Sequence, residues 1–310
     1  LIVVSALLGI GSGLIIPLST GLVSRYFVGT YRVKQFGLSS AITNITLVVA
    51  TAVTGYLAEV NWHLPFVVYL LPIISLVLSV YLQRSMASEG STSLTNDKAP
   101  ADKEEDVDTG NSKYGIHVRH LAGIMGVYGL ATFLVLVVSF NLPFLMEEYH
   151  FTSGNSGIMI SLFFLAIMLP GFFIGRIIAR LKQYVNFVSL LSIAVGLCCI
   201  GLFRDRALIV LGALLAGLGY GAMQPVIYDK AATIAPPRSA MLALSFVMAM
   251  NYLAVMACPF VVDFLRHLFH AQGDRFPFLL NALLTLILAV AAGLRRNRFT
   301  LGLDASYYKN

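Results

Sequence analysis

The sequence predicts an all-α, polytopic membrane protein with about nine transmembrane helices. Of its 310 residues, 58% are hydrophobic and only 12% are charged, which excludes a soluble domain. The apolar residues form runs of about 20, and at 1.5 Å per residue such a helix crosses the ~30 Å hydrocarbon core of a bilayer. The runs are continuous and do not alternate with polar residues, so they favour helices over barrel strands. The predicted spans are 1–24, 36–58, 64–83, 121–146, 153–181, 185–203, 207–233, 239–265 and 276–294.

A glycine-rich motif occurs twice and indicates an internal repeat. The pattern Gly-x-Gly-x-Gly-x-x-x-Pro fills residues 9–17 and returns at residues 217–225. Its membrane-length apolar flanks argue against a phosphate-binding loop, which needs a preceding strand, and favour glycines that let helix backbones approach closely. A Pro-Phe pair opens a later apolar run after each copy, at residues 65–66 and 277–278. Self-similarity in a fixed order predicts a duplicated helical bundle.

A polar stretch at residues 84–118 divides the chain. It is rich in Asp, Glu, Ser, Thr and Lys and has no aromatic residue before Tyr114, so it predicts a solvated cytoplasmic linker. Residues 1–83 carry three spans, residues 119–296 carry six, and residues 297–310 form a cytoplasmic tail. The repeat makes the first three spans the second part of a six-span half. We therefore expect three further spans upstream, so that this sequence runs from the fourth to the twelfth helix of a 6+6 protein.

The basic residues predict the orientation. With the first residue outside, every one of the 21 Lys and Arg residues except Arg204, Arg206, Arg266 and Arg275 falls on the cytoplasmic side. Because Lys and Arg concentrate in cytoplasmic loops, this asymmetry places the first residue outside and the C-terminus inside. We expect a multi-pass protein of a bacterial cytoplasmic (inner) membrane.

Two six-helix halves, a central linker and a Gly/Pro-rich fourth helix in each half together resemble the major facilitator superfamily of transporters. The resemblance covers essentially all 310 residues and implies two pseudo-symmetric halves that alternate access to a midplane site. In the fourth-helix Arg-x-x-x-Gly motif of the family, this sequence keeps Gly9 but has Ser5 for the arginine that is associated with proton coupling. The fifth-helix antiporter motif keeps only Gly55. The motif of the loop between the eighth and ninth helices keeps Gly175 and Arg180, which implies a gating role for both.

Polar residues inside the spans are the candidates for substrate binding, because a polar group in hydrocarbon is unfavourable unless it is used. Gln224 and Tyr228 are four residues apart and so share one helix face. The resemblance places Asn44 and Asn251 on helices that line the transport cavity, and Asn141 interrupts another span. An interhelical hydrogen bond without ligand contact is the alternative for each of these five.

Asp229 lies within a span beside Lys230, which predicts either an ion pair at the membrane interface or a carboxylate that carries a proton. Asp263 and Arg266 are expected to form a local salt bridge. The two histidine pairs offer two ligands each and predict no metal site, and no catalytic residue or cofactor is expected. The residues assigned to coupling or gating are Asp229, Arg180, Gly175, Gly9, Gly13, Pro17, Gly217, Gly221 and Pro225.

These features predict a secondary active transporter that exports small amphipathic or drug-like molecules with proton coupling. Tyr128, Tyr220 and Phe246 are among the aromatic residues that would give the cavity an apolar wall if they face inward. The alternatives are a nutrient uptake permease for a sugar, peptide or organic anion, a membrane enzyme, or a sensor that has lost transport. We expect a monomer whose partners are its small-molecule substrate, the lipid bilayer and protons, with no nucleic acid.

Overall fold

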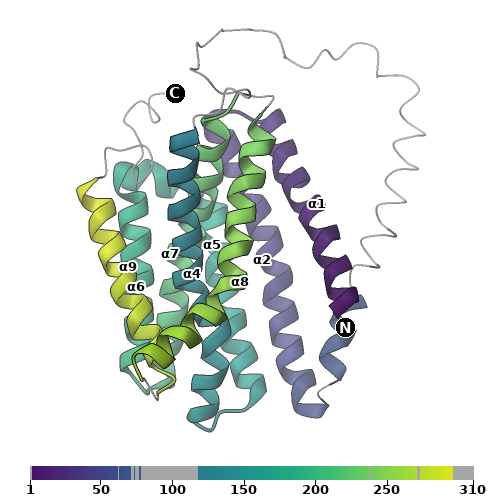
Figure 1. The fold of residues 1–310 in the computed structure, drawn as a ribbon, viewed down its shortest axis with the longest axis vertical. Helices are drawn as coiled ribbons and strands as arrows, with labels where there is room; N and C mark the ends of the chain where they lie inside the picture. Colours follow the sequence, from purple (N-terminus) through teal and green to yellow (C-terminus); the bar gives the residue numbers. More distant parts are fainter. Residues whose placement is uncertain are drawn as a thin grey trace.

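The computed structural model describes residues 2–61, 63–70, 73, 77, 118–236, 239–270 and 273–295, and this part of the chain is helical without any β-strand (Figure 1). The predicted all-α class is confirmed. The elements in chain order are α1 (Ile2–Tyr26), α2 (Gly29–Val60), the 3-10 helix η1 (Leu64–Leu70), α4 (Val118–Glu148), α5 (Ser153–Leu181), the 3-10 helix η2 (Lys182–Tyr184), α6 (Val185–Leu202), α7 (Arg206–Thr233), α8 (Ala240–Leu268) and α9 (Phe276–Leu294).

Six stretches of the described chain are long and apolar enough to cross a membrane, by length and composition. One of them, Ser153–Leu202, contains both α5 and α6. The predicted number of nine is therefore not confirmed. The predicted linker, except its last residue, and the predicted tail lie outside the described residues, as does most of the predicted span 64–83. The six stretches are Tyr31–Val60, Val118–Glu148, Ser153–Leu202, Arg206–Thr233, Ala240–Leu268 and Phe276–Leu294.

Helix α2 begins seven residues before the predicted span at 36–58. Gly29 has a φ of +58°, which glycine adopts without steric penalty, and it allows α2 to start with only two residues between it and the end of α1. Arg32 and Lys34 therefore lie on the first turns of a helix, not in a loop. Hydropathy predicts only the part of a helix that lies in hydrocarbon. Backbone hydrogen bonds continue the helix into the headgroup region, so α2 is longer than the predicted span.

Helix α2 packs against α5 along most of its length (Figure 1). The two backbones approach so closely that a Cβ built on Gly37 would lie 2.6 Å from the carbonyl oxygen of Gly171. Near the other end, a Cβ on Gly55 would lie 2.9 Å from the Cα of Gly157. Small residues thus allow the segment before the linker to pack directly on the segment after it. We call this contact the α2–α5 seam.

The two copies of the glycine motif have different surroundings. In α7, Gly217 faces the carbonyl oxygen of Phe163 on α5, and Gly221 faces the backbone of Ile167. In α1, nothing within the described part of the chain comes within 4 Å of a Cβ built on Gly9 or on Gly13. Pro17 lies inside α1 and Pro225 inside α7. The close approach predicted for the motif is therefore seen for the second copy.

Large apolar side chains cover much of the outside of the bundle. Phe260 is 71% exposed and Leu294 is 82% exposed, for example, while the buried core joins residues of α4 to α9. A soluble protein rarely exposes so much continuous apolar surface, but a bilayer solvates it. The predicted salt bridge between Asp263 and Arg266 is wrong, because Arg266 pairs with Asp274 in the turn that precedes α9.

We expect Gly37→Ala to destabilise the protein by about 1–3 kcal/mol, because its Cβ would collide with the backbone of Gly171 and would force the seam apart. Thermal unfolding of the purified protein, followed by circular dichroism, measures the effect. Gly126→Ala in α4 is the matched control, since a Cβ there meets nothing within 4 Å. Equal unfolding temperatures for the two variants would contradict the close contact.

Candidate functional site

A cluster of hydrogen-bonded polar side chains lies where α2, α4, α7 and α8 meet. The contributing residues lie in the middle part of their helices, except Tyr228, which is five residues before the end of α7, so the cluster extends from the middle of the bundle toward that end. Most members are spaced four residues apart on one helix, which places them on one face. The members of this cluster, which we call the tyrosine cluster, are Ser40, Asn44, Tyr128, Thr132, Tyr220, Gln224, Tyr228 and Asn251.

The centre of the cluster is made of three tyrosines from α4 and α7. The hydroxyl oxygens of Tyr128 and Tyr228 are 2.9 Å apart, and the hydroxyl of Tyr220 donates to that of Tyr128 at 3.4 Å. The rings of Tyr128 and Tyr220 are stacked, with centroids 6.3 Å apart, and Tyr228 meets Tyr128 edge-on at 5.6 Å. All three side chains are buried. Buried hydroxyl groups need partners, and here they supply one another.

Helix α2 joins the cluster through Ser40. The Ser40 hydroxyl donates to Gln224 Oε1 at 2.8 Å, and the Gln224 amide donates in turn to the Tyr228 hydroxyl at 3.0 Å. Asn44 lies one turn further along α2 and donates to the Ser40 carbonyl oxygen at 2.7 Å. The chain of hydrogen bonds therefore crosses from the segment before the linker to the segment after it.

Helix α8 joins the cluster through Asn251. Thr132 donates to Asn251 Oδ1 at 2.7 Å, and the hydroxyl oxygen of Tyr220 lies 3.3 Å from the same oxygen. Within the described residues these bonds use only the oxygen of the Asn251 amide, so its N–H groups remain able to donate to a ligand. Asn251 is half-buried, which leaves that amide accessible.

Four of the five residues predicted to bind substrate, namely Asn44, Gln224, Tyr228 and Asn251, meet in this cluster. Asn141 is buried in α4 but lies nine residues beyond Thr132, about 13 Å along the helix, and takes part in none of the cluster's hydrogen bonds. Its role in substrate binding stays a prediction. The structure brings four of the five predicted side chains together, and their binding of substrate also stays a prediction.

Sequence reasoning missed four contributors. Tyr128 and Tyr220 were expected as apolar walls, whereas their hydroxyl groups are hydrogen-bonded, and Ser40 and Thr132 were not singled out. Their spacing was the available signal, because Ser40 precedes Asn44 by four residues and Tyr128 precedes Thr132 by four. Phe246, by contrast, is 47% exposed.

An ion pair lies next to the cluster, toward the start of α2 and the end of α7. We call this the basic end of the bundle, because Arg25, Arg32 and Lys34 lie there. Arg32 Nε is 2.6 Å from Asp229 Oδ1, and the same guanidinium donates to the Thr233 hydroxyl at 2.7 Å. The Asp229 side chain is 1% exposed, and its second oxygen has no hydrogen-bond partner within the described part of the chain. An ion pair of Asp229 was predicted, but its partner Arg32 was not, and the pair connects α7 to α2. Arg238, a further cation of this region, lies outside the described residues.

The two predicted gating residues of α5 have different surroundings. A Cβ built on Gly175 would lie 2.9 Å from Cε of Lys34, so the absence of a side chain leaves room for the lysine stem. Arg180 is exposed in the last turn of α5. A metal centre would need at least three convergent ligands, and no such group of His, Cys, Asp or Glu occurs among the described residues.

Comparison with known proteins gives one family. Residues 1–105 and 121–304 match the model of the family described as Major Facilitator Superfamily, so the match extends over most of the chain and over both sides of the polar stretch. No curated protein matches the sequence significantly. The family match covers every member of the tyrosine cluster and both residues of the ion pair.

We expect Tyr128→Phe to lower the free energy of unfolding by about 0.5–1.5 kcal/mol, because it removes the hydroxyl between Tyr220 and Tyr228 while keeping the ring. Thermal unfolding of the purified protein measures this loss. Tyr252→Phe is the matched control, because Tyr252 is 44% exposed and belongs to none of these bonds. A loss of the same size in both variants would show that the hydroxyl network contributes no stability.

Proposed function

The chain belongs to the Major Facilitator Superfamily and is a membrane transporter, and from this premise we propose that it exports small amphipathic molecules in exchange for protons. The observation that carries the proposal is the tyrosine cluster. It is centred on the middle parts of its helices and is shared by the segments on both sides of the predicted linker, as expected for a substrate site that two rocking halves expose in turn.

The chemistry of the cluster favours amphipathic substrates. When the cluster opens, its three tyrosine rings would offer apolar faces, and their hydroxyls together with three side-chain amides would supply a few oriented polar groups. Every member of the cluster is uncharged. Such a wall suits a molecule with an apolar body and a few polar atoms, whereas a sugar needs a polar partner for most of its hydroxyl groups. We therefore propose drug-like compounds as the substrate class.

The ion pair supports a proposal for gating. Arg32 on α2 and Asp229 on α7 hold the two segments together at the basic end of the bundle. At the same end a Cβ on Gly21 of α1 would lie 2.7 Å from Cγ of Met241 on α8, and α1 diverges from α8 toward its own N-terminus (Figure 1). We propose that this arrangement is closed at the basic end, which the orientation predicted from the Lys and Arg residues makes cytoplasmic. Opening that end would then require the salt bridge to break.

Asp229 is the residue that we propose couples transport to protons. Among the described residues it is the one buried carboxylate. A proton on Asp229 would remove its attraction to Arg32 and so favour separation of α2 from α7. Substrate binding at the adjacent Tyr228 and protonation at Asp229 would then act on neighbouring residues of one helix. The family arginine replaced by Ser5 has no part in this proposal.

The proposal is tested in everted membrane vesicles that contain the full-length protein. A panel of fluorescent amphipathic dyes is followed while respiration energises the vesicles, with and without a protonophore. Accumulation that collapses with the protonophore is the expected result. No accumulation, together with counterflow of a sugar, peptide or organic anion, would overturn export and support an uptake permease.

We expect Gln224→Leu and Asn251→Leu each to reduce dye transport by roughly tenfold or more, because each change leaves hydrogen-bonding partners in the cluster unpaired where the substrate would bind. Asn281→Leu in α9 is the matched control, since the Asn281 amide donates only within its own helix, to the Pro277 carbonyl oxygen. Normal transport by both cluster variants would remove this site from the substrate path.

We expect Asp229→Asn to abolish protonophore-sensitive accumulation while substrate counterflow continues, because an amide still fills the site but cannot exchange a proton. Asp263→Asn, at an exposed position on α8, is the matched control and should behave like wild type. Parallel vesicle assays of accumulation and of counterflow separate the two outcomes. Full accumulation by Asp229→Asn would assign proton coupling to another group.

A further inference from the structure

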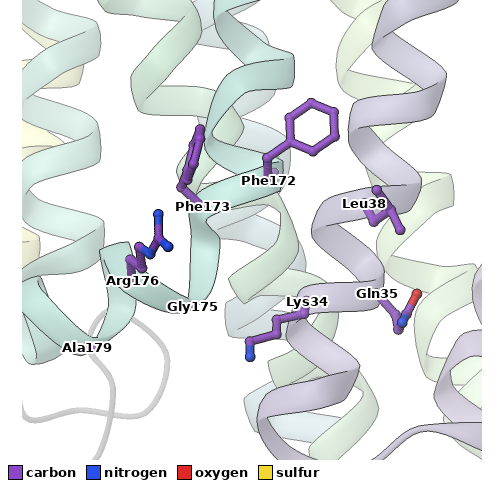
Figure 2. A pocket seen from close by; sticks show the side chains of 9 residues that line it. Lys34, Gln35, Leu38, Phe172, Phe173, Gly175, Arg176 and Ala179 are labelled. Atoms are coloured by element: carbon purple, nitrogen blue, oxygen red, sulfur yellow. The ribbon is translucent and has the colours of Figure 1, made fainter.

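A second candidate binding site is a groove along the outer edge of the α2–α5 seam, near the basic end of the bundle (Figure 2). Its volume is about 600 Å³, within the usual range of small-molecule sites. It does not include any member of the tyrosine cluster or either residue of the ion pair. The lining residues are Lys34, Gln35, Leu38, Gly171, Phe172, Phe173, Gly175, Arg176 and Ala179.

One end of the groove is positively charged. Lys34 extends from α2 and Arg176 from α5, and both side chains are exposed (Figure 2). The salt bridges found in the described part of the chain use other residues, so no carboxylate there neutralises these two cations. Gly175 gives the lysine stem its place in the groove, because a Cβ at that position would lie 2.9 Å from Cε of Lys34.

The other end of the groove is apolar. Leu38 lies one turn from Lys34 toward the middle of α2, and Phe172 lies one turn from Arg176 toward the middle of α5 (Figure 2). Both are exposed at the surface that faces the bilayer, Leu38 to 40% and Phe172 to 53%. The groove therefore changes from cationic to apolar in the direction that leads from the membrane surface toward the hydrocarbon core.

We propose that this groove binds one anionic phospholipid of the leaflet at the basic end, with its phosphate between Lys34 and Arg176 and its acyl chain along Leu38 and Phe172. Guanidinium and ammonium groups are the usual partners of phosphate, and Lys34 and Arg176 supply one of each. A soluble phosphate compound would leave the apolar half of the groove uncovered. The order of charge and hydrophobicity along the groove matches a lipid.

Such a lipid would connect the segments on the two sides of the linker, because one cation belongs to α2 and the other to α5. It would add a contact across the seam without touching the tyrosine cluster. The inference goes beyond the proposed transport function and does not rest on it, since it concerns binding at the membrane-facing surface.

The test is native mass spectrometry of the purified full-length protein, titrated with phosphatidylglycerol or with phosphatidylcholine. We expect one phosphatidylglycerol to bind more tightly than phosphatidylcholine. Lys34→Gln and Arg176→Gln should each weaken that binding by about fivefold, and the double variant by about thirtyfold, while phosphatidylcholine binding stays unchanged. Because both side chains are exposed, neither change removes a buried contact.

The double variant Arg25→Gln with Lys182→Gln is the matched control. It removes two exposed cations from the same end of the bundle but outside the groove, and its affinity for phosphatidylglycerol should stay within about twofold of wild type. Equal affinity of the wild-type protein for the two lipids, or an equal loss in the control, would overturn the proposal. Displacement of the lipid by inorganic phosphate alone would also overturn it, by showing that the apolar half contributes nothing.

Discussion

The close backbone contact between α2 and α5 fixes the geometry on which the other sites depend. Where Gly37 meets Gly171 and Gly55 meets Gly157, no side chain separates the two helices. This contact sets the position of α2 along its axis and the direction in which its other side chains point, so that they reach α7. One face brings Ser40 to Gln224, and the first turns bring Arg32 to Asp229. The groove that we propose binds a lipid lies along the outside of the same contact.

The arrangement on α7 explains how substrate and proton could act on one another. Tyr228 belongs to the cluster, and the next residue, Asp229, forms the ion pair with α2. A helix is rigid over so short a distance, so a shift of α7 that accommodates a ligand at Tyr228 must also move the carboxylate. The coupling that we propose would then rest on one rigid helix with two contacts to α2, without a relay over a longer distance.

Much of this could be predicted from the sequence, and the failures have identifiable physical causes. Hydropathy and the glycine repeat predicted the helical membrane fold and the family. The free-energy cost of polar groups in hydrocarbon indicated Asn44, Gln224 and Asn251 as candidate site residues, and all three belong to the tyrosine cluster. Hydropathy could not show that α2 begins at Gly29, so Arg32 was assigned to a loop and its pairing with Asp229 was missed. Nor could it show which face of a helix a hydroxyl occupies, so Ser40 and Thr132 remained unnoticed among many similar residues. Partners across helices depend on helix rotation, which a single sequence specifies only weakly.

Helix α2 is also tied to α5 at the end opposite the ion pair, where Glu59 Oε1 accepts a hydrogen bond from the backbone nitrogen of Gly154 at 2.7 Å. A carboxylate at the start of a helix satisfies an otherwise unpaired N–H group and interacts favourably with the helix dipole. With this hydrogen bond at one end and glycine contacts along its length, α2 is held to α5 on one face. Rotation of α2 about its own long axis would turn larger side chains into the space that Gly37 and Gly55 leave, so the glycine contacts oppose it. Any relative movement of α2 and α5 therefore has to open part of the seam.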